Sequence, residues 1–516
     1  MDFLQFLAEQ VVLFDGGMGT EIQKLDIRTD EWGGYYGCNE ILSLTSPARI
    51  GSIHRAYLEA GADVIETNTF GAQRLTLQEY GLAERTEEIN REAVQLARRE
   101  IDGFRTSTSE RGGPRFIAGA VGPGTMLPSL GHVHFSDLYT SYFDQAAGLC
   151  QGGVDLFIIE TSQDPLQAKA ALLAIRDAQR DYGHTGPVIV SVTVESAGTL
   201  LVGSTIEAVV TAIAPLGPDI MGINCATGPE EMRPHIRRLA ARFTGPVFCM
   251  PNAGFPEERN GQLVYTLSPE EFAATLTSFV SEYGVDVIGG CCGADPRFIR
   301  ALRRKLSGLH RAERNPAGHP ALASLYSSQP LRQEPPPLFI GERANPNGSK
   351  AFRTCLLQDD LDGMTAIAKR QAREGAHALD LSVAYTGRDE QADMERIVPA
   401  FVTAVDLPIV IDSTNPATVE AALQHIGGRA LINSVNLEEG EEHAAALFAL
   451  AARYGAAIIC LTIDEEGMAM TSVRKAEVAG RLIELASEAG LRPRDLVIDP
   501  LTFTLGSGDT SLKNAG

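Results

Sequence analysis

The residues best placed to do chemistry are three cysteines that follow short apolar runs. Cys291 and Cys292 stand in the string Gly-Gly-Cys-Cys-Gly directly after the apolar residues 285–288, and Cys225 ends a similar run over 220–224. Zinc prefers thiolate ligands, and three of them leave the fourth tetrahedral position open to a substrate. The sequence therefore predicts one zinc site, assembled by tertiary folding from these three residues.

The predicted ligand set favours activation of a sulfur nucleophile. A zinc ion with three thiolates has a negative formal charge, and a substrate thiol loses its proton when it binds a metal. The bound sulfur stays electron-rich, which suits attack on a methyl group. Hydrolytic zinc sites more often use histidine ligands and a more acidic metal.

Two other interpretations of the cysteines remain open. Free cysteine packs well in protein cores, and this is how we interpret the scattered Cys38, Cys150, Cys249, Cys355 and Cys460. The adjacent pair could also form a disulfide, although a reducing cytosol disfavours this. A paired Cys-Cys flanked by glycines, with a third cysteine at another strand end, favours the metal site.

Two carboxylates are candidates for binding a substrate ammonium. Asp15 begins the string DGGMGT at residues 15–20, directly after the first apolar run, and Glu160 lies at the end of the fourth. In parallel α/β barrels the active site forms at the carboxyl ends of the strands. The alternative is that each carboxylate caps a helix or is a solvated surface charge.

The elements that must position these residues repeat in a regular pattern. Apolar runs of strand length, rich in Val and Ile, alternate with amphipathic helical stretches, as expected for strands buried on both faces. The runs span 11–17, 62–70, 116–123, 155–161, 187–194, 220–226, 246–254 and 285–293. Eight βα units predict a closed (β/α)8 barrel over residues 1–306. An open doubly wound sheet is the alternative, but no glycine-rich dinucleotide fingerprint follows the first strand.

A second domain is predicted after a linker. Residues 307–337 are rich in Pro, Ala, Ser and Arg and are interpreted as an extended linker. Over residues 338–516 the βα pattern restarts, with apolar runs at 338–342, 378–383, 408–412, 430–435, 456–463 and 496–499. The predicted fold class is α/β, with two TIM-type barrels in tandem and the second stopping at about six strands. Because an incomplete barrel exposes edges, we expect the sequence to be part of a longer protein, with a six-stranded open sheet as the alternative.

The strand ends of the second domain carry polar residues that can recognise a flat heterocycle. Glu342, Asp412, Asn433 and Asp499 each lie at the end of a predicted strand. Carboxylates accept hydrogen bonds from ring N–H and amino groups, and an asparagine amide both donates and accepts. A pterin presents such edges. The alternative is that these residues cap the helices that follow.

Composition limits the classes of partner that we expect the protein to bind. The chain has 516 residues and a formal net charge of −22, which argues against nucleic acid and anionic membranes as partners. No apolar run reaches the length of a membrane span, and the first residues do not resemble a signal peptide. The scattered cysteines do not form a secreted disulfide framework, so we expect a cytoplasmic protein.

The first domain resembles the homocysteine S-methyltransferase family. The matching strings are DGGMGT at 15–20, ETNTF at 66–70, GINC at 222–225 and GGCCG at 289–293. The resemblance implies that Cys225, Cys291 and Cys292 hold zinc and that the homocysteine sulfur is the fourth ligand. It also implies that Asp15 and Glu160 hold the amino-acid end of homocysteine.

The second domain resembles the pterin-binding, methyltetrahydrofolate-using domain of the cobalamin-dependent methionine synthase family. The matching strings are GERAN at 341–345, Asp412-Ser413, Asn433-Ser434 and Asp499-Pro500. The resemblance implies that Glu342, Asp412, Asn433 and Asp499 bind the pterin of methyltetrahydrofolate, the co-substrate. It also implies methionine formation through cobalamin. The sequence contains no Asp-x-His-x-x-Gly cobalamin motif, so we expect the cobalamin-binding module downstream or in trans.

Two rival functions remain. A cobalamin-independent homocysteine methyltransferase using betaine or S-methylmethionine would share the first barrel. The polar strand ends of the second domain argue against it, and so does the single tryptophan, Trp32, where a quaternary ammonium would need an aromatic cage. The other rival is a non-catalytic protein that binds zinc or homocysteine, which an open fourth ligand position disfavours.

Overall fold

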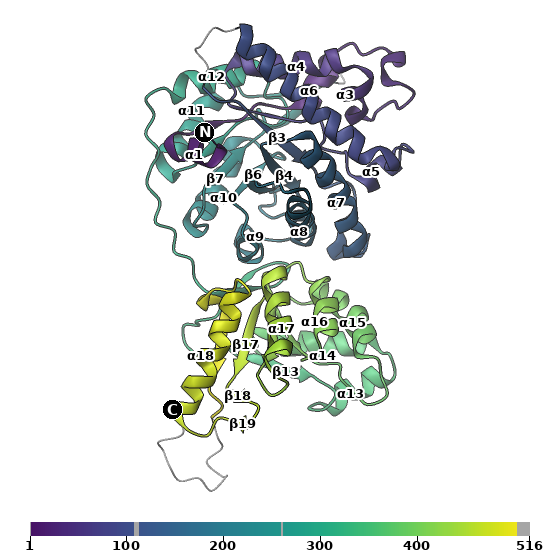
Figure 1. The fold of residues 1–516 in the computed structure, drawn as a ribbon, viewed down its shortest axis with the longest axis vertical. Helices are drawn as coiled ribbons and strands as arrows, with labels where there is room; N and C mark the ends of the chain where they lie inside the picture. Colours follow the sequence, from purple (N-terminus) through teal and green to yellow (C-terminus); the bar gives the residue numbers. More distant parts are fainter. Residues whose placement is uncertain (1, 108–112, 260–261, 503–516) are drawn as a thin grey trace. The chain divides into compact units, whose positions relative to one another are not determined.

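The computed structural model describes residues 2–107, 113–259 and 262–502. Its contacts divide the chain into two units: the first extends to Gly318, and the main part of the second begins at His319. Figure 1 follows the chain from the first unit, in purple to teal, to the second, in green to yellow. No helix of the described residues has the length and apolar character needed to cross a membrane.

The first unit is an eight-stranded parallel barrel, as predicted. Its strands pair in the order β1-β10-β7-β6-β5-β4-β3-β2, and a parallel bridge between Phe14 and Val64 joins the two ends of that order. The strands are β1 (Val12–Leu13), β2 (Val64–Glu66), β3 (Phe116–Val121), β4 (Leu156–Ser162), β5 (Val188–Val192), β6 (Ile220–Asn224), β7 (Val247–Met250) and β10 (Val287–Ile288). Each overlaps a run predicted from the sequence, and only β4 extends beyond its run, by one residue.

Helices surround this barrel (Figure 1). They are α1 (Phe3–Glu9), α2 (Met18–Lys24), α3 (Leu42–Thr45), α4 (Pro47–Ala60), α5 (Arg74–Gln78), α6 (Thr86–Ser107), α7 (Phe135–Gly152), α8 (Pro165–Tyr182), α9 (Ile206–Ile213), α10 (Pro229–Arg242), α11 (Pro269–Tyr283) and α12 (Pro296–Leu306). Short 3-10 turns lie at 29–32, 39–41, 83–85, 128–130 and 214–216. Local sequence sets the helix ends: α8 is capped at its start by Asp164, whose side chain accepts from Leu166 N, and at its end by Gly183 in the left-handed conformation.

The core explains why only one end of the barrel is available for chemistry. The rings of Phe14 and Phe248 meet edge to face at 5.3 Å inside the barrel. At the amino ends of the strands, Phe3 and Phe6 of α1 pack on Phe116, with ring centroids 5.3 and 5.4 Å apart. Helix α1 therefore closes that end, and the polar strand ends lie at the opposite, carboxyl end.

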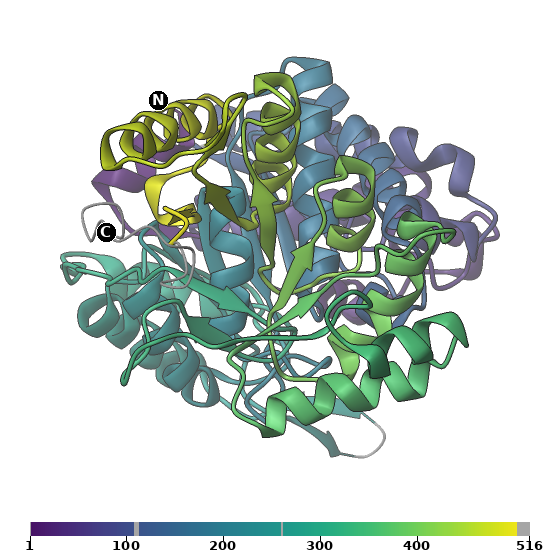
Figure 2. The same ribbon diagram turned by 90° about the horizontal axis from the view of Figure 1, so that it is seen from below.

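The second unit contains six parallel strands in the order β13-β14-β15-β16-β17-β20, as predicted. They are β13 (Ile340–Ala344), β14 (Ala378–Leu381), β15 (Ile409–Asp412), β16 (Leu431–Val435), β17 (Ala457–Leu461) and β20 (Leu496–Asp499). The helices are α13 (Lys350–Leu357), α14 (Leu361–Arg373), α15 (Glu390–Ala404), α16 (Pro416–Leu423), α17 (Glu441–Tyr454) and α18 (Ser472–Glu488), with a 3-10 turn at 493–495. Figure 2 shows these strands, in green to yellow, inside helices of the same colours.

Part of the segment predicted to be an extended linker is folded. Strands β11 (Ala321–Ala323) and β12 (Ser328–Pro330) form an antiparallel pair, and Leu322 is fully buried against the sheet of the second unit. Two further hairpins interrupt the βα pattern: β8 (Pro256–Arg259) with β9 (Gln262–Tyr265), and β18 (Ile463–Asp464) with β19 (Gly467–Met468). The sequence pattern did not predict these three hairpins, because each strand is only two to four residues long.

A buried arginine attaches the β11–β12 hairpin to the second unit. Arg429 forms a 2.5 Å ion pair with Asp495, and both side chains are about 95% buried. Its guanidinium also donates to the carbonyl oxygens of Ala321 and Gly455, each at 3.0 Å. The Arg429 guanidinium thus links the hairpin, the end of α17 and the turn before β20.

We expect Arg429→Met to lower the free energy of unfolding of the second unit by about 2–4 kcal/mol, because it leaves the carbonyl groups of Ala321 and Gly455 buried without this donor and leaves Arg492 as the remaining charged partner of Asp495. Urea denaturation of the full chain measures the change. The double variant Arg429→Met/Asp495→Leu should recover only part of the loss, because the two carbonyl groups still lack a donor and Arg492 loses its carboxylate partner. As a control, Arg343→Ala removes an exposed 3.9 Å pair with Glu374 and should cost less than about 1 kcal/mol. An equal loss for both single variants would contradict the prediction.

Candidate metal centre and substrate sites

The structure brings the three predicted cysteine ligands together at the carboxyl end of the first barrel. Their Sγ atoms all lie within 4.8 Å of one another, and Cys225 Sγ is 3.9 Å from Cys292 Sγ. A tetrahedral zinc ion with bonds of about 2.3 Å requires sulfur atoms about 3.8 Å apart. The three thiols therefore fit a zinc ion in both chemistry and spacing.

Strand β7 explains how residues so far apart in sequence meet. It lies between β6, which precedes Cys225, and β10, which precedes Cys291. The last residue of β7 and the residues that follow it hold all three cysteines by backbone hydrogen bonds. Cys225 N donates to Met250 O at 3.0 Å, Cys291 N to Pro251 O at 2.9 Å, and Ala253 N to Cys292 O at 3.0 Å. The backbones of the three cysteines are thus fixed by the sheet.

Glycines allow the chain to pass close to the thiols. A Cβ atom on Gly17 would lie 2.8 Å from the carbonyl oxygen of Cys291. Gly293 follows Cys292 with a φ of +79°, and a Cβ atom there would lie 2.3 Å from the ring of Tyr265. A side chain at either position would displace the cysteine loop or the aromatic ring, so glycine is required sterically at both.

The three thiols of the cluster differ in pKa. Hydrogen bonds from Cys225 and Cys291, and a further one from Tyr265, lower the pKa of Cys292. The pKa of Cys291 is raised by its hydrogen bonds to Cys225 and Cys292 and then by burial. The cluster therefore favours one thiolate with two thiols donating to it. Tyr265, at the end of β9, is a contact that the sequence pattern did not indicate.

Three carboxylates gather at the same end of the barrel. Asp15 follows β1, Glu66 ends β2 and Glu160 lies in β4; they are 1%, 8% and 7% exposed. Asp15 Oδ2 accepts a hydrogen bond from Glu66 N at 3.0 Å. Asp15 and Glu160 were predicted site residues. Glu66 was not, although it begins the string ETNTF that the sequence comparison singled out.

Asp15, Glu66 and Glu160, together called the carboxylate group, lack a positively charged partner among the described residues. Asp15 Oδ1 and Glu66 Oε1 are buried with no hydrogen-bond partner, and no ion pair of the described residues includes any of the three. Burial raises the pKa of all three groups: for Asp15 and Glu66 the charge of Glu160 adds to the effect, and the pKa of Glu160 rises to about 8. Buried carboxylates with raised pKa values and no positively charged partner favour the binding of a cationic ligand such as an ammonium group.

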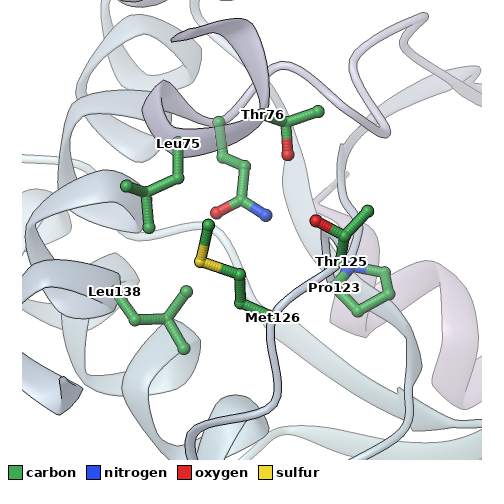
Figure 3. A pocket seen from close by; sticks show the side chains of 7 residues that line it. Leu75, Thr76, Pro123, Thr125, Met126 and Leu138 are labelled. Atoms are coloured by element: carbon green, nitrogen blue, oxygen red, sulfur yellow. The ribbon is translucent and has the colours of Figure 1, made fainter. Parts of the chain in front are cut away.

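One pocket of the first unit is too small to be the substrate site. Its lining residues are Gln73, Leu75, Thr76, Pro123, Thr125, Met126 and Leu138, at the start of α5, after β3 and on α7 (Figure 3). Its free volume is about 10 Å³. That is room for about one water molecule, so an amino acid cannot bind there.

Polar side chains also converge at the carboxyl ends of the strands in the second unit. Asn433 Nδ2 donates to Asp380 Oδ1 at 3.1 Å, and Asn345 Nδ2 donates to Asp412 Oδ2 at 3.1 Å. Asp380 and Asn345, which were not predicted, therefore lie beside the predicted residues Asn433 and Asp412. Asp380 was missed because it lies inside the apolar run 378–383 rather than at its end.

The other two predicted residues of this group differ in their surroundings. Glu342 is exposed on β13, and its charge reaches Asp380 without a hydrogen bond between them. Asp499 Oδ1 accepts from the backbone N–H of Leu501 at 2.8 Å. That bond stabilises a local turn rather than capping a helix, and it leaves Oδ2 of Asp499 for another donor.

Asp380 is expected to lower stability at neutral pH. Burial raises its pKa to about 6; the charge of Asp412 adds to this, while the hydrogen bond from Asn433 opposes it. As pH rises from about 4 to 6, the unfolded chain ionises before the folded one, so the folded state loses stability that it keeps when protonated.

We therefore expect Asp380→Asn to raise the free energy of unfolding by about 1–3 kcal/mol at pH 7 and to have little effect at pH 4. Chemical denaturation at the two pH values measures the difference. Glu395→Gln, an exposed change on α15, is the control and should be neutral at both. A gain of equal size at pH 4 and pH 7 would show that ionisation of Asp380 is not the cause.

The first unit defines a class of protein. It is a (β/α)8 barrel with three convergent thiols and a buried carboxylate group at one end. The family profile of homocysteine S-methyltransferases matches residues 12–306, and the profile of pterin-binding enzymes matches residues 341–515. The first match covers more than half of the 516 residues. The chain belongs to the homocysteine S-methyltransferase family.

Curated relatives extend the similarity over both units. Methionine synthase of Mycobacterium tuberculosis is 44% identical over 522 residues, and that of Mycobacterium leprae is 42% identical over 524. In each case the alignment covers 100% of this chain but 43% of the relative, so the chain spans less than half their length. Among solved structures, the metallated homocysteine methyltransferase MmuM of Escherichia coli is 22% identical, with a TM-score of 0.47, and covers 58% of this chain and 98% of its own.

Proposed function

We propose that this chain binds the two substrates of methionine formation, homocysteine in the first unit and methyltetrahydrofolate in the second. The observation that carries the proposal is the convergence of three thiols and three buried carboxylates at one end of one barrel. An amino acid with a thiol at one end and an ammonium at the other matches these two groups. The family profiles of both units support the same assignment.

We propose that Cys225, Cys291 and Cys292 hold zinc. Zinc bound there would accept the thiol of homocysteine as its remaining ligand and keep it deprotonated at neutral pH. The protein's own part is to present three sulfur atoms on backbones already fixed by β7. Asp15, Glu66 and Glu160 would bind the ammonium of the same molecule and hold its sulfur at the metal.

In the second unit, Asp380, Asp412 and Asn433 would bind the pterin ring, with Glu342 and Asp499 at the edges. Their carbonyl and carboxylate oxygens accept hydrogen bonds from ring N–H and amino groups. Loss of a methyl group from the pterin nitrogen requires a proton or hydrogen bond at that nitrogen in the transition state. Asp380, whose pKa is raised to about 6, is the described group best suited to supply one near neutral pH.

We propose cobalamin as the methyl carrier between the two sites, on a module downstream or in trans. The curated relatives, which are more than twice as long as this chain, support a further module of this kind. All eight cysteines are free, and three thiols that bind metal must stay reduced, so the proposed location is the cytoplasm.

The test is a donor assay with the zinc-loaded chain and homocysteine. Free methylcobalamin should support methionine formation, whereas betaine and S-methylmethionine should not. Methyltetrahydrofolate binding is measured separately by calorimetry, and Asp412→Ala should weaken it at least tenfold without changing turnover with methylcobalamin.

Two results would favour the rival functions. Turnover with betaine or S-methylmethionine but not with methylcobalamin would indicate a cobalamin-independent methyltransferase. Stoichiometric zinc and homocysteine binding without methyl transfer from any donor would indicate a binding protein.

A further inference from the structure

Asn224 connects the carboxylate group to the metal centre of the first unit. It is the last residue of β6, directly before Cys225, and its side chain is 1% exposed. Its amide faces the end of β4, where Glu160 is followed by Thr161. One side chain thus lies between a residue of the carboxylate group and a predicted metal ligand.

Every hydrogen-bonding position of this amide is used. Asn224 Oδ1 accepts from Thr161 N at 2.8 Å and from Ser191 Oγ at 2.7 Å. Asn224 Nδ2 donates to Thr161 Oγ1 at 2.8 Å and to Glu160 Oε2 at 3.3 Å. An asparagine offers two donor hydrogens and two acceptor lone pairs, and all four are satisfied here. Such an amide has one orientation and fixes the groups around it.

The backbone at both ends of this contact is held in an uncommon conformation. Thr161 has a φ of +58° and Cys225 a φ of +63°. Residues with a side chain rarely adopt positive φ, and a β-branched residue such as threonine does so least readily. Conformations of this kind persist only where the surroundings impose them. Asn224 bonds both the N–H and the hydroxyl of Thr161 and so stabilises the turn that directs Glu160 into the site.

We infer that Asn224 is a positioning residue that fixes Glu160 at a set distance from the sulfur site, so that one molecule must carry both an ammonium and a thiol to fill the two. This inference rests on the proposed function of the first unit. Cys225 has its own backbone anchor, the bond from Cys225 N to Met250 O. Loss of the amide should therefore affect the carboxylate side and leave the metal in place.

The consequence is selectivity between thiols. Homocysteine uses both the metal and the carboxylates, whereas 1-propanethiol offers sulfur alone. The wild-type protein should bind homocysteine more tightly than 1-propanethiol, and Asn224→Ala should reduce that preference. If Asn224 served only in folding, its replacement would lower the affinity for both thiols, the retention of zinc and the thermal stability together.

The experiment titrates zinc-loaded and Co(II)-loaded protein with the two thiols, using calorimetry and the visible absorption of cobalt. For Asn224→Ala we expect homocysteine affinity to fall at least tenfold, with 1-propanethiol affinity and metal stoichiometry within threefold of wild type. Ser191→Ala removes one of the four bonds and should give a smaller loss of the same kind; it decides the question if Asn224→Ala does not fold.

Asn90→Ala is the matched control. Asn90 is also fully buried, and its amide donates to the carbonyl oxygens of Ala72 and Thr86, each at 2.8 Å, without contacting the site. It should lower thermal stability and leave both thiol affinities unchanged.

Two results overturn the inference. One is unchanged homocysteine affinity in the Asn224 and Ser191 variants, and the other is an equal loss of affinity for both thiols. A wild-type protein with no preference for homocysteine over 1-propanethiol would instead overturn the proposed function.

Discussion

Replacing Cys292 with alanine is expected to release the metal and abolish methyl transfer to homocysteine. Changes to residues that only contact a metal ligand typically cost about 10–100-fold in metal affinity, so loss of a ligand itself should cost more than about 100-fold. The barrel should remain folded, because Cys292 is held by backbone bonds and is partly exposed. Metal content after dialysis against a weak chelator and turnover with methylcobalamin measure the two effects.

Cys150→Ala is the control for this variant. Cys150 lies on α7 in the same barrel and is partly buried, away from the three thiols. It should retain one equivalent of zinc and full turnover. Retention of zinc and activity by Cys292→Ala would remove the assignment of the metal centre.

Asp15→Asn is expected to weaken homocysteine binding about 10–100-fold while zinc stays bound, because hydrogen bonds to charged groups contribute about 1.5–3 kcal/mol. The asparagine oxygen can still accept from Glu66 N, which Asp15 Oδ2 does at 3.0 Å. The new amide N–H groups would take the place of Oδ1, which is buried and unpartnered. An N–H donor at this position repels the N–H groups of an ammonium. We therefore expect weaker binding of homocysteine and unchanged binding of zinc.

The same variant should be more stable than wild type at neutral pH. Burial is the main cause that raises the pKa of Asp15, so the folded state is destabilised as pH rises above the ordinary aspartate value. Calorimetric titration with homocysteine and thermal unfolding at pH 7 measure the two effects, with the half-exposed Glu88→Gln on α6 as the control. Homocysteine affinity equal to wild type would show that the carboxylate group does not bind the substrate.

The strands were predictable because parallel strands buried on both faces appear in sequence as continuous apolar runs. All fourteen runs overlap a strand of the two main sheets. Site residues at the ends of such runs, such as Cys225 and Asp412, were therefore predictable as well. Asp380 lies within a run, and Tyr265 ends a four-residue strand, so neither carried a signal in the pattern.

The sequence by itself determined which residues could do chemistry and at which end of each barrel they lie. Residue type selects the ligands, and the direction of parallel strands places every strand end on one side. Tertiary structure alone decided which of these residues touch. The pairing order β10-β7-β6 brings Cys225 to Cys291 and Cys292, and side-chain reach across strands adds Glu66 to Asp15 and Asn224 to Glu160. Such contacts depend on strand order, register and burial, which are properties of the folded barrel and not of any local stretch of chain.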